Sequence, residues 1–347
     1  MKFFFVNFIL ILITLLSFIF SKFKPQKKAL YFIAFKKNNN KIIDKRSSLY
    51  CNENNLKNSI NFIRCFNLAS VIELFFKYKR IIVINSLQYF FSEKTVKKFI
   101  KKIFLSNQID NFFMIDDYRY LNVFLPVCSD AKVFSHGYMH GRISKNLLYQ
   151  RSLFNNNFDN YYVWSNYFKK KILEINKTYT DKNIIVLDYY KNYFKIKNLT
   201  KHKKKNILFL QEDNIPKKYI IKIVDKLKKK SKDYNFYYKV RPNNTILEKE
   251  KIFFKNKNIN VFEQTKLSKL IKEKKINFIF GMNSSFLYIA SLNNLYPISV
   301  INKYMLKDFK KDQIVFILDF KKNLDKQFQN FLKNKKKLNS IKKKLWY

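Results

Sequence analysis

Two of the three histidines and two of the three glycines fall in one segment, Ser-His-Gly-Tyr-Met-His-Gly at residues 135–141. It follows a short apolar run at residues 132–134 that is typical of a strand. A neutral imidazole directly after a strand could take the proton of a hydroxyl nucleophile, which contributes ~10²–10⁴ in rate. We expect His136 to face a cleft and act as this base. A structural hydrogen-bonding histidine is the alternative.

Other groups near this segment could assist. Gly137, His140 and Arg142 are expected on the same acceptor side, with Arg142 pairing with a phosphate or carboxylate. Asp117 belongs to an Asp-Asp pair after the apolar run at residues 112–115, and it is a second catalytic candidate or merely a helix cap. The two histidines do not suggest zinc, because Gly137 stands where the HExxH motif needs a glutamate.

The second segment is Gly-Met-Asn-Ser-Ser at residues 281–285, between a strand-like and a helix-like stretch. Glycine permits close backbone approach, and the first N–H groups of a helix can bind an anion. The alternative is a plain helix cap. In parallel sheets ligands bind after the strands, so we expect an activated donor to contact strand-end residues: Lys239, Arg241, Glu263, Gly281, Asn283, Ser284 and Ser285. Glu212 also follows a strand-like run and counts among these informative strand-end residues, without a specific role of its own.

The elements that must position these residues alternate between short apolar runs and longer amphipathic stretches, the pattern of parallel βαβ units. We therefore expect an α/β protein with two Rossmann-like domains facing a cleft. The ranges are 29–195 for an acceptor-side domain, 205–322 for a donor-binding domain and 323–347 for a basic terminal helix.

Residues 3–20 carry no charge and are just long enough to span a bilayer. Lysines are denser after this stretch than before it, which favours a cytoplasmic body by the positive-inside rule. We expect residues 1–24 to anchor the protein at the cytoplasmic face of the inner membrane. A buried helix or strand is the alternative.

The net charge is +46 in 347 residues. The chain is rich in Lys, Asn, Ile, Phe and Tyr and poor in Gly and Pro, which indicates a general compositional bias. The positive charge is therefore expected to be spread over the surface rather than concentrated in a binding patch. No stretch interleaves arginines with aromatics as a nucleic-acid groove would, so a nucleic-acid partner is not expected. Three dispersed cysteines give no disulfide framework and no zinc pattern.

Several enzyme classes lack their motif here: there is no GxxxxGK[ST], no GxGxxG and no GxSxG. An Asp-x-Asp metal signature is also missing, so the sequence favours chemistry without a metal or cofactor.

These pieces together resemble the GT-B arrangement and are similar to bacterial capsule and teichoic-acid transferases, including the CDP-glycerol glycerophosphotransferase family. The resemblance covers roughly residues 110–300. It rests on Phe134-Ser135-His136-Gly137, on Lys239-Val240-Arg241-Pro242, and on the Ser-Ser turn within residues 280–300. Arg241 departs from the family, since a histidine is expected at that position.

The resemblance implies transfer of a sugar, or a polyol phosphate, from a nucleotide-activated donor to a glycan or lipid-linked acceptor at the inner-membrane surface. Two alternatives stay open. One is a basic protein that binds nucleic acid or a membrane surface without chemistry; the other is an inactive relative of the transferases.

Overall fold

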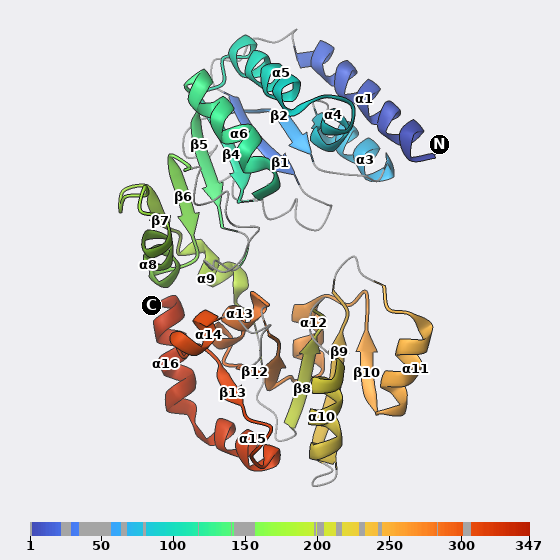
Figure 1. Ribbon diagram of the computed structural model, residues 1–347, viewed down its shortest axis with the longest axis vertical. Coiled ribbons are helices and arrows are strands. Elements are labelled where there is room, and N and C mark those ends of the chain that lie inside the picture. The colour runs from blue at the N-terminus through green and yellow to red at the C-terminus, as the bar shows by residue number, and fades with distance from the viewer. Residues whose placement is uncertain are drawn as a thin grey trace. The chain divides into compact units, whose positions relative to one another are not determined.

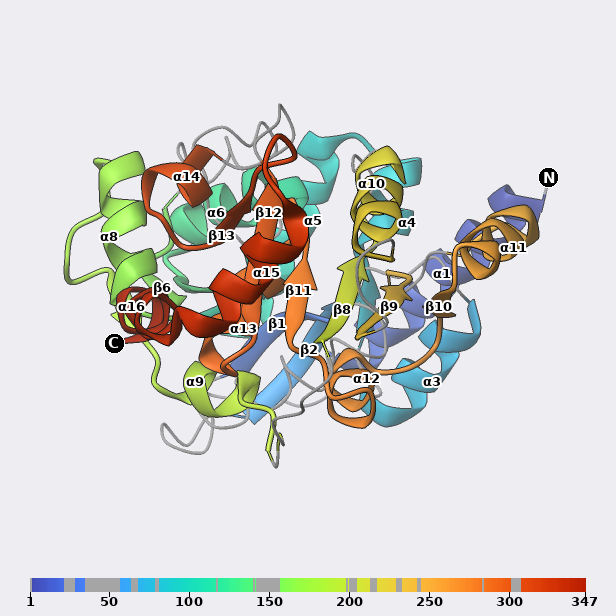
Figure 2. The ribbon, with the colours of Figure 1, turned by 90° about the horizontal axis from the view of Figure 1, so that it is seen from below.

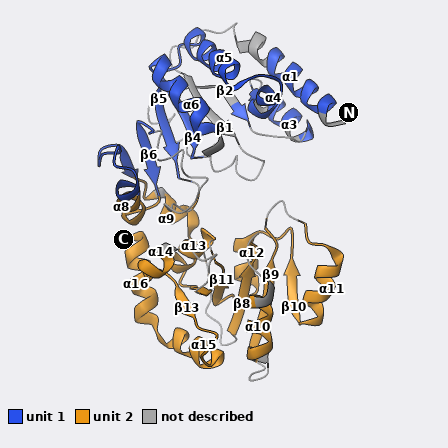
Figure 3. Ribbon diagram, in the orientation of Figure 1, with its two compact units in different colours: residues 1–140, 147–163, 172–185 blue, residues 141–146, 164–171, 186–347 orange. Residues whose placement is uncertain are grey.

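The computed structural model describes residues 2–21, 29–34, 57–63, 68–78, 81–116, 118–139, 141, 157–197, 199, 205–212, 217–228, 233–241, 245–282, 284–300 and 307–347. The chain divides into two compact units (Figure 3). The first takes its described residues from 1–140, 147–163 and 172–185, and the second from 141–146, 164–171 and 186–347. The sequence had assigned 164–171 and 186–195 to the first domain.

The first unit is built on a seven-stranded sheet in the order β3-β2-β1-β4-β5-β6-β7 (Figure 1). The pairs from β3 to β6 are all parallel. Its strands are β1 (Ala29–Ala34), β2 (Lys57–Ile63), β3 (Ile81–Val83), β4 (Asn111–Ile115), β5 (Phe134–Tyr138), β6 (Asn160–Val163) and β7 (Ile184–Val186).

Helices pack against this sheet: α1 (Lys2–Ser21), α3 (Leu68–Tyr78), α4 (Ile84–Phe90), α5 (Glu93–Ser106) and α6 (Tyr118–Ala131). Aromatic rings fill the space between sheet and helices. Phe62 lies edge-on to Phe104, Phe112 and Phe124 at centroid distances of 5.1 to 6.2 Å. Such pairs add stability beyond the area that they bury.

The strand predicted at residues 132–134 begins later than expected, because Lys132 and Val133 form the turn after helix α6, which ends at Ala131. Lys132 has a φ of 54°, and the N–H of Val133 donates to the carbonyl of Cys128 at 2.9 Å, which closes the helix end. The strand begins only at Phe134 and runs through the histidine-glycine segment.

The second unit holds a six-stranded parallel sheet in the order β10-β9-β8-β11-β12-β13. Its strands are β8 (Lys205–Leu210), β9 (Tyr234–Lys239), β10 (Ile259–Phe262), β11 (Phe278–Phe280), β12 (Tyr296–Val300) and β13 (Phe316–Leu318). The helices that follow strands in the chain are α10 (Lys217–Lys228), α11 (Glu248–Asn256), α12 (Leu267–Glu273), α13 (Phe286–Leu292) and α14 (Lys307–Lys311).

The C-terminal segment is part of this unit rather than a separate basic helix. It forms two helices, α15 (Leu324–Lys333) and α16 (Lys335–Trp346), divided at Asn334, whose side chain caps α16 by accepting from the Lys337 N–H at 3.0 Å. The indole of Trp346 is buried and stacks on Trp164 at a centroid distance of 6.2 Å.

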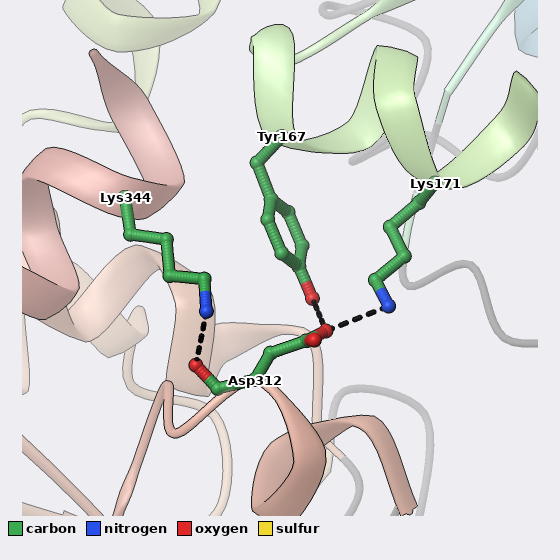
Figure 4. A network of polar contacts seen from close by, with 4 residues as sticks. All are labelled: Tyr167, Lys171, Asp312 and Lys344. Carbon is green, nitrogen blue, oxygen red and sulfur yellow. Dashed lines mark hydrogen bonds and ion pairs between the residues drawn. The ribbon is translucent and has the colours of Figure 1, made fainter. Parts of the chain in front are cut away.

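Helix α8 (Asn166–Ile175) begins within this unit and is tied to it by a buried ion pair (Figure 4). Asp312 accepts from Tyr167 Oη at 2.6 Å and pairs with Lys171 Nζ at 2.7 Å, while Lys344 Nζ donates to the Asp312 carbonyl at 2.6 Å. Burial opposes ionisation of Asp312, but these hydrogen bonds and positive charges outweigh it and lower its pKa. Helix α9 (Tyr189–Phe194) also belongs to this unit.

Helix α1 covers the stretch that was expected to anchor the protein, and it packs along β3, α3 and α4. Of the helices in the described part of the chain, none is both long and apolar enough to cross a membrane.

Candidate functional site

His136 lies in the middle of β5 and has no exposed surface. Its ring stacks on Phe113 from β4 at a centroid distance of 4.1 Å. Its Nε2 donates to Asn111 Oδ1 at 3.0 Å, and Tyr162 Oη donates to its Nδ1 at 3.1 Å, so the Nε2–H tautomer satisfies both contacts. The expectation that His136 faces a cleft from a strand end is therefore wrong.

Burial also changes the acidity of this histidine. It lowers the pKa of His136 to about 3, so the ring stays uncharged at neutral pH. A catalytic base works best with a pKa near the working pH and within reach of its substrate. In this setting His136 holds β4, β5 and β6 together, and a catalytic role no longer follows from its position.

Gly137 is required by packing. A Cβ built on it would lie 2.3 Å from Cδ2 and Cε2 of Phe158, whose ring is buried and stacks on Tyr161. Gly141, in contrast, has no atom of the described residues within 4 Å of such a Cβ. The glycine that follows the histidine therefore makes room for an aromatic ring.

Asp117, His140, Arg142 and Asn283 lie outside the described residues, so their roles stay predictions. The neighbouring Asp116, directly after β4, is buried and accepts a hydrogen bond from Tyr161 Oη at 2.5 Å. Its N–H donates to the Tyr138 carbonyl at 3.0 Å, which links the ends of β4 and β5.

The second unit brings the strand-end residues of β8 and β11 together. These two strands are neighbours, but the chain passes from β8 to β9 on one side and returns to β11 on the other, so the strand order reverses between them. Ligands of open parallel sheets bind at such a point, beyond the carboxyl ends of the strands. Here Oε1 of Glu212, from the loop after β8, accepts from the Met282 N–H after β11 at 2.9 Å.

Gly281 makes this contact possible. A Cβ on residue 281 would lie 2.6 Å from Glu212 Oε1. The glycine thus admits a carboxylate of the protein itself at the place where the sequence predicted an anion of the donor. Sequence reasoning counted Glu212 among the informative strand-end residues but gave it no specific role; the signal was an acidic residue two positions after a buried strand.

The two serines lie at the start of α13. Ser284 Oγ accepts from the Phe286 N–H at 3.2 Å, and the Ser285 side chain makes no capping hydrogen bond. Both residues are partly exposed. This contact of Ser284 fits the alternative that the segment is a plain helix cap rather than an anion site.

The basic residue that ends β9 differs from the one that follows it. Lys239 is buried, and its Nζ donates to the carbonyls of Val240 and Glu263 at 2.5 Å each, so it fastens the end of β9 to the end of β10. Burial lowers its pKa, while the nearby Glu263 charge opposes that effect. Arg241 is exposed, and its backbone N–H donates to Gln211 Oε1 at 2.7 Å, beside the β8 loop.

Glu263, after β10, is engaged by a neighbouring helix: its Oε1 lies 2.7 Å from Lys251 Nζ of α11. Among the donor-side residues in the described part, Gly281, Ser284 and Ser285 follow β11 and Arg241 follows β9. Gly281 adjoins the Glu212 contact, and the Arg241 N–H donates to Gln211, the residue before Glu212. Lys239 and Glu263 serve as a clamp between β9 and β10.

No group of three histidine, cysteine or carboxylate side chains in the described residues is arranged to hold a metal ion.

Comparison with solved structures decides the fold. MnaA from S. aureus, solved with UDP, matches with a TM-score of 0.60 and 12% identity over 92% of this chain and 91% of that one. This chain has a GT-B-like fold. The UDP-GlcNAc 2-epimerase from Neisseria meningitidis (TM-score 0.58, 12% identity, 91% and 94% coverage) and a glycosyltransferase from Rickettsia africae (0.53, 13%, 92% and 93%) agree.

Comparison by sequence adds little to the fold. No family model matches the chain, and the resemblance to CDP-glycerol transferases stays a prediction. The periplasmic chaperone PpiD of Buchnera aphidicola is 28% identical over 177 residues, which are 48% of this chain and 27% of that protein. The chain thus spans about a quarter of this curated relative.

Proposed function

We propose that the protein is a glycosyltransferase-like enzyme that uses a nucleotide-activated donor and transfers its sugar, or a polyol phosphate, to a surface polysaccharide or its lipid-linked precursor. The observation that carries the proposal is the contact between Glu212 and the Met282 N–H, because it brings the β8 and β11 loops together where the strand order reverses. Structures of the same fold were solved with UDP and with UDP-GlcNAc, which supports a nucleotide-sugar ligand.

Each group near this point has a chemical use in the proposal. Arg241 supplies an exposed guanidinium for the donor phosphates, and the Ser284 and Ser285 hydroxyls supply further donors. Glu212 holds the loops after β8 and β11 together through its bond to the Met282 N–H and so positions the donor-side groups. Lys239 supports the site by holding strand ends rather than by touching the donor.

The acceptor side needs a base other than a buried histidine. Asp117 comes two residues after β4 and His140 two residues after β5, and β4 and β5 are paired neighbours. Because carboxyl ends of parallel strands share one edge of a sheet, we propose that one of these two residues takes the acceptor proton.

The donor side can be tested by thermal unfolding with UDP-, CDP- and GDP-sugars, CDP-glycerol and CMP-linked sugars. A ligand at 100 times its Kd adds about 2.7 kcal/mol, which raises the Tm of a unit of this size by roughly 5–10 °C. Arg241→Gln should abolish most of the shift. The control Lys249→Gln removes one charge from an exposed site on α11 and should leave the shift unchanged.

Two outcomes would contradict the donor site: no nucleotide shifts the Tm, or Arg241→Gln and Lys249→Gln behave alike. A second candidate, epimerisation of the nucleotide sugar without transfer, is favoured by the likeness to two UDP-GlcNAc 2-epimerase structures at TM-scores of 0.58 and 0.59, above the 0.53 of the Rickettsia glycosyltransferase. NMR of the purified donor with enzyme and no acceptor separates them, since only an epimerase converts the donor alone.

A further inference from the structure

Helix α1 is fixed to the sheet edge by one side. Leu10, Asn7 and Thr14 on this side are buried. Thr14 Oγ1 accepts from the Val83 N–H of β3 at 3.0 Å, and Ser86 Oγ of α4 donates to Asn7 Oδ1 at 3.1 Å. The polar groups of α1 thus satisfy polar groups at the sheet edge, and withdrawing the helix would leave them unpaired.

The opposite side of α1 is apolar and exposed. Six large side chains there are 44% to 63% exposed: Phe4, Phe5, Phe8, Leu12, Leu15 and Leu16. At 3.6 residues per turn they fall within one stripe roughly 120° wide. With about 150–200 Å² for each side chain, about half of it exposed, this face presents on the order of 500 Å², at the upper end for a monomer. Helix α1 packs along β3, α3 and α4, and Figures 1 and 2 show its N-terminal end projecting beyond them.

We propose that this exposed face of α1 docks in the plane of an anionic lipid bilayer. Nineteen consecutive residues from Phe3 to Ser21 carry no charge, whereas Lys2 precedes them and Lys22 and Lys24 follow in the sequence. The chain as a whole carries a net charge of +46. An apolar face on a strongly basic protein fits a surface that combines hydrocarbon with negative headgroups.

The net charge also disfavours the main alternative, in which a second copy of the chain covers this face. A second copy of the chain offers the same apolar face but brings another +46 charges, so two copies repel each other at low ionic strength. The bonds of Asn7 and Thr14 fix the orientation: the helix keeps its inner side on the protein and lies flat. This inference does not depend on the proposed transferase activity.

The binding test uses the full chain and sedimentation with vesicles of phosphatidylcholine alone and of phosphatidylcholine with 30% phosphatidylglycerol. We expect binding to the anionic vesicles that weakens with salt. The variant Phe5→Gln/Leu12→Gln/Leu16→Gln should bind them at least about 100-fold more weakly, because three half-exposed apolar groups are lost. The matched control Leu247→Gln/Ile252→Gln removes exposed apolar residues at the start of α11 and within it and should bind like the parent.

A depth measurement tests the orientation. Single tryptophans at positions 4, 8, 12 and 16 are compared for quenching by lipids brominated at different depths; the native Trp164 and Trp346 are buried and give a constant background. Flat docking predicts one shallow depth for all four positions. Depth that changes steadily along the helix would overturn the proposal, and so would equal binding by the triple variant and the control. A parent that ignores vesicles but dimerises through α1 in light scattering would also overturn it.

Discussion

Replacement of Gly137 by alanine should destabilise the first unit strongly, because the new methyl group has no room. It would lie 2.3 Å from two ring carbons of Phe158 and 2.6 Å from a third, whereas ordinary carbon contacts begin near 3.5 Å. Phe158 cannot turn away easily: it is 1% exposed, its N–H is held by Tyr179 Oη at 2.8 Å, and its ring stacks on Tyr161. Overpacking costs about 1–3 kcal/mol, and we expect the upper end here.

Gly141→Ala is the matched control from the same segment. Among the residues that the structure describes, none has an atom within 4 Å of its added Cβ, and no glycine has a positive φ. It should change stability by no more than about 0.5 kcal/mol, or increase it slightly by restricting the unfolded chain.

The assay is thermal unfolding followed by circular dichroism. About 3 kcal/mol corresponds to a fall in Tm of roughly 6–12 °C for a unit of this size. The loss of stability caused by Gly137→Ala should be smaller in a Phe158→Leu background than in the parent, since residues 137 and 158 are in contact. If both glycine variants unfold at the same temperature, or if Phe158→Leu leaves the cost of Gly137→Ala unchanged, the packing argument is refuted.

Two further predictions concern buried titratable groups. The pKa of His136 is about 3 in the folded protein and near 6.5 when unfolded, so folding excludes a proton and stability falls as pH drops from 6.5 toward 3. Urea titrations at pH 7 and pH 5 should show the parent losing about 2 kcal/mol more than His136→Asn; parallel losses would contradict the assignment. Asp312→Asn leaves the buried Lys171 without its charge partner and should cost about 3 kcal/mol in the same assay. The exposed pair of Asp188 and Lys191 is the reference, and Asp188→Asn should cost less than about 1 kcal/mol; equal costs would argue against the buried network.

Periodicity predicts much of the second unit because its strands are continuous apolar runs covered on both faces. All six residues of β8 are buried, and so are all five of β12. The same reasoning misses β2, which reads Lys-Asn-Ser-Ile-Asn-Phe-Ile and has three polar residues at its start. Only pairing with β1 and β3 makes it a strand, and long-range pairing leaves no local signal.

The candidate site divides in the same way. The sequence correctly predicted that Arg241 and Gly281 lie just beyond strand ends. Chain order alone determines which residues follow β9 and β11. It did not show that the Lys239 ammonium turns inward to two carbonyls or that His136 is inside its strand. Those outcomes depend on which side of a strand a residue occupies and on where α6 ends, and a one-residue change in strand register exchanges buried for exposed positions.

The stacking of Trp346 on Trp164 has a consequence for biosynthesis. The second unit can close only after residue 346 has been synthesised, since Trp164, Phe194 and Trp346 form one aromatic cluster. At about 5–20 residues per second the ribosome takes roughly 9–36 s to advance from residue 164 to residue 346. Throughout that interval the rings of Trp164 and Phe194 lack their packing partner Trp346. We therefore expect this protein to depend more on chaperones during translation than a unit whose core is formed by segments close in sequence.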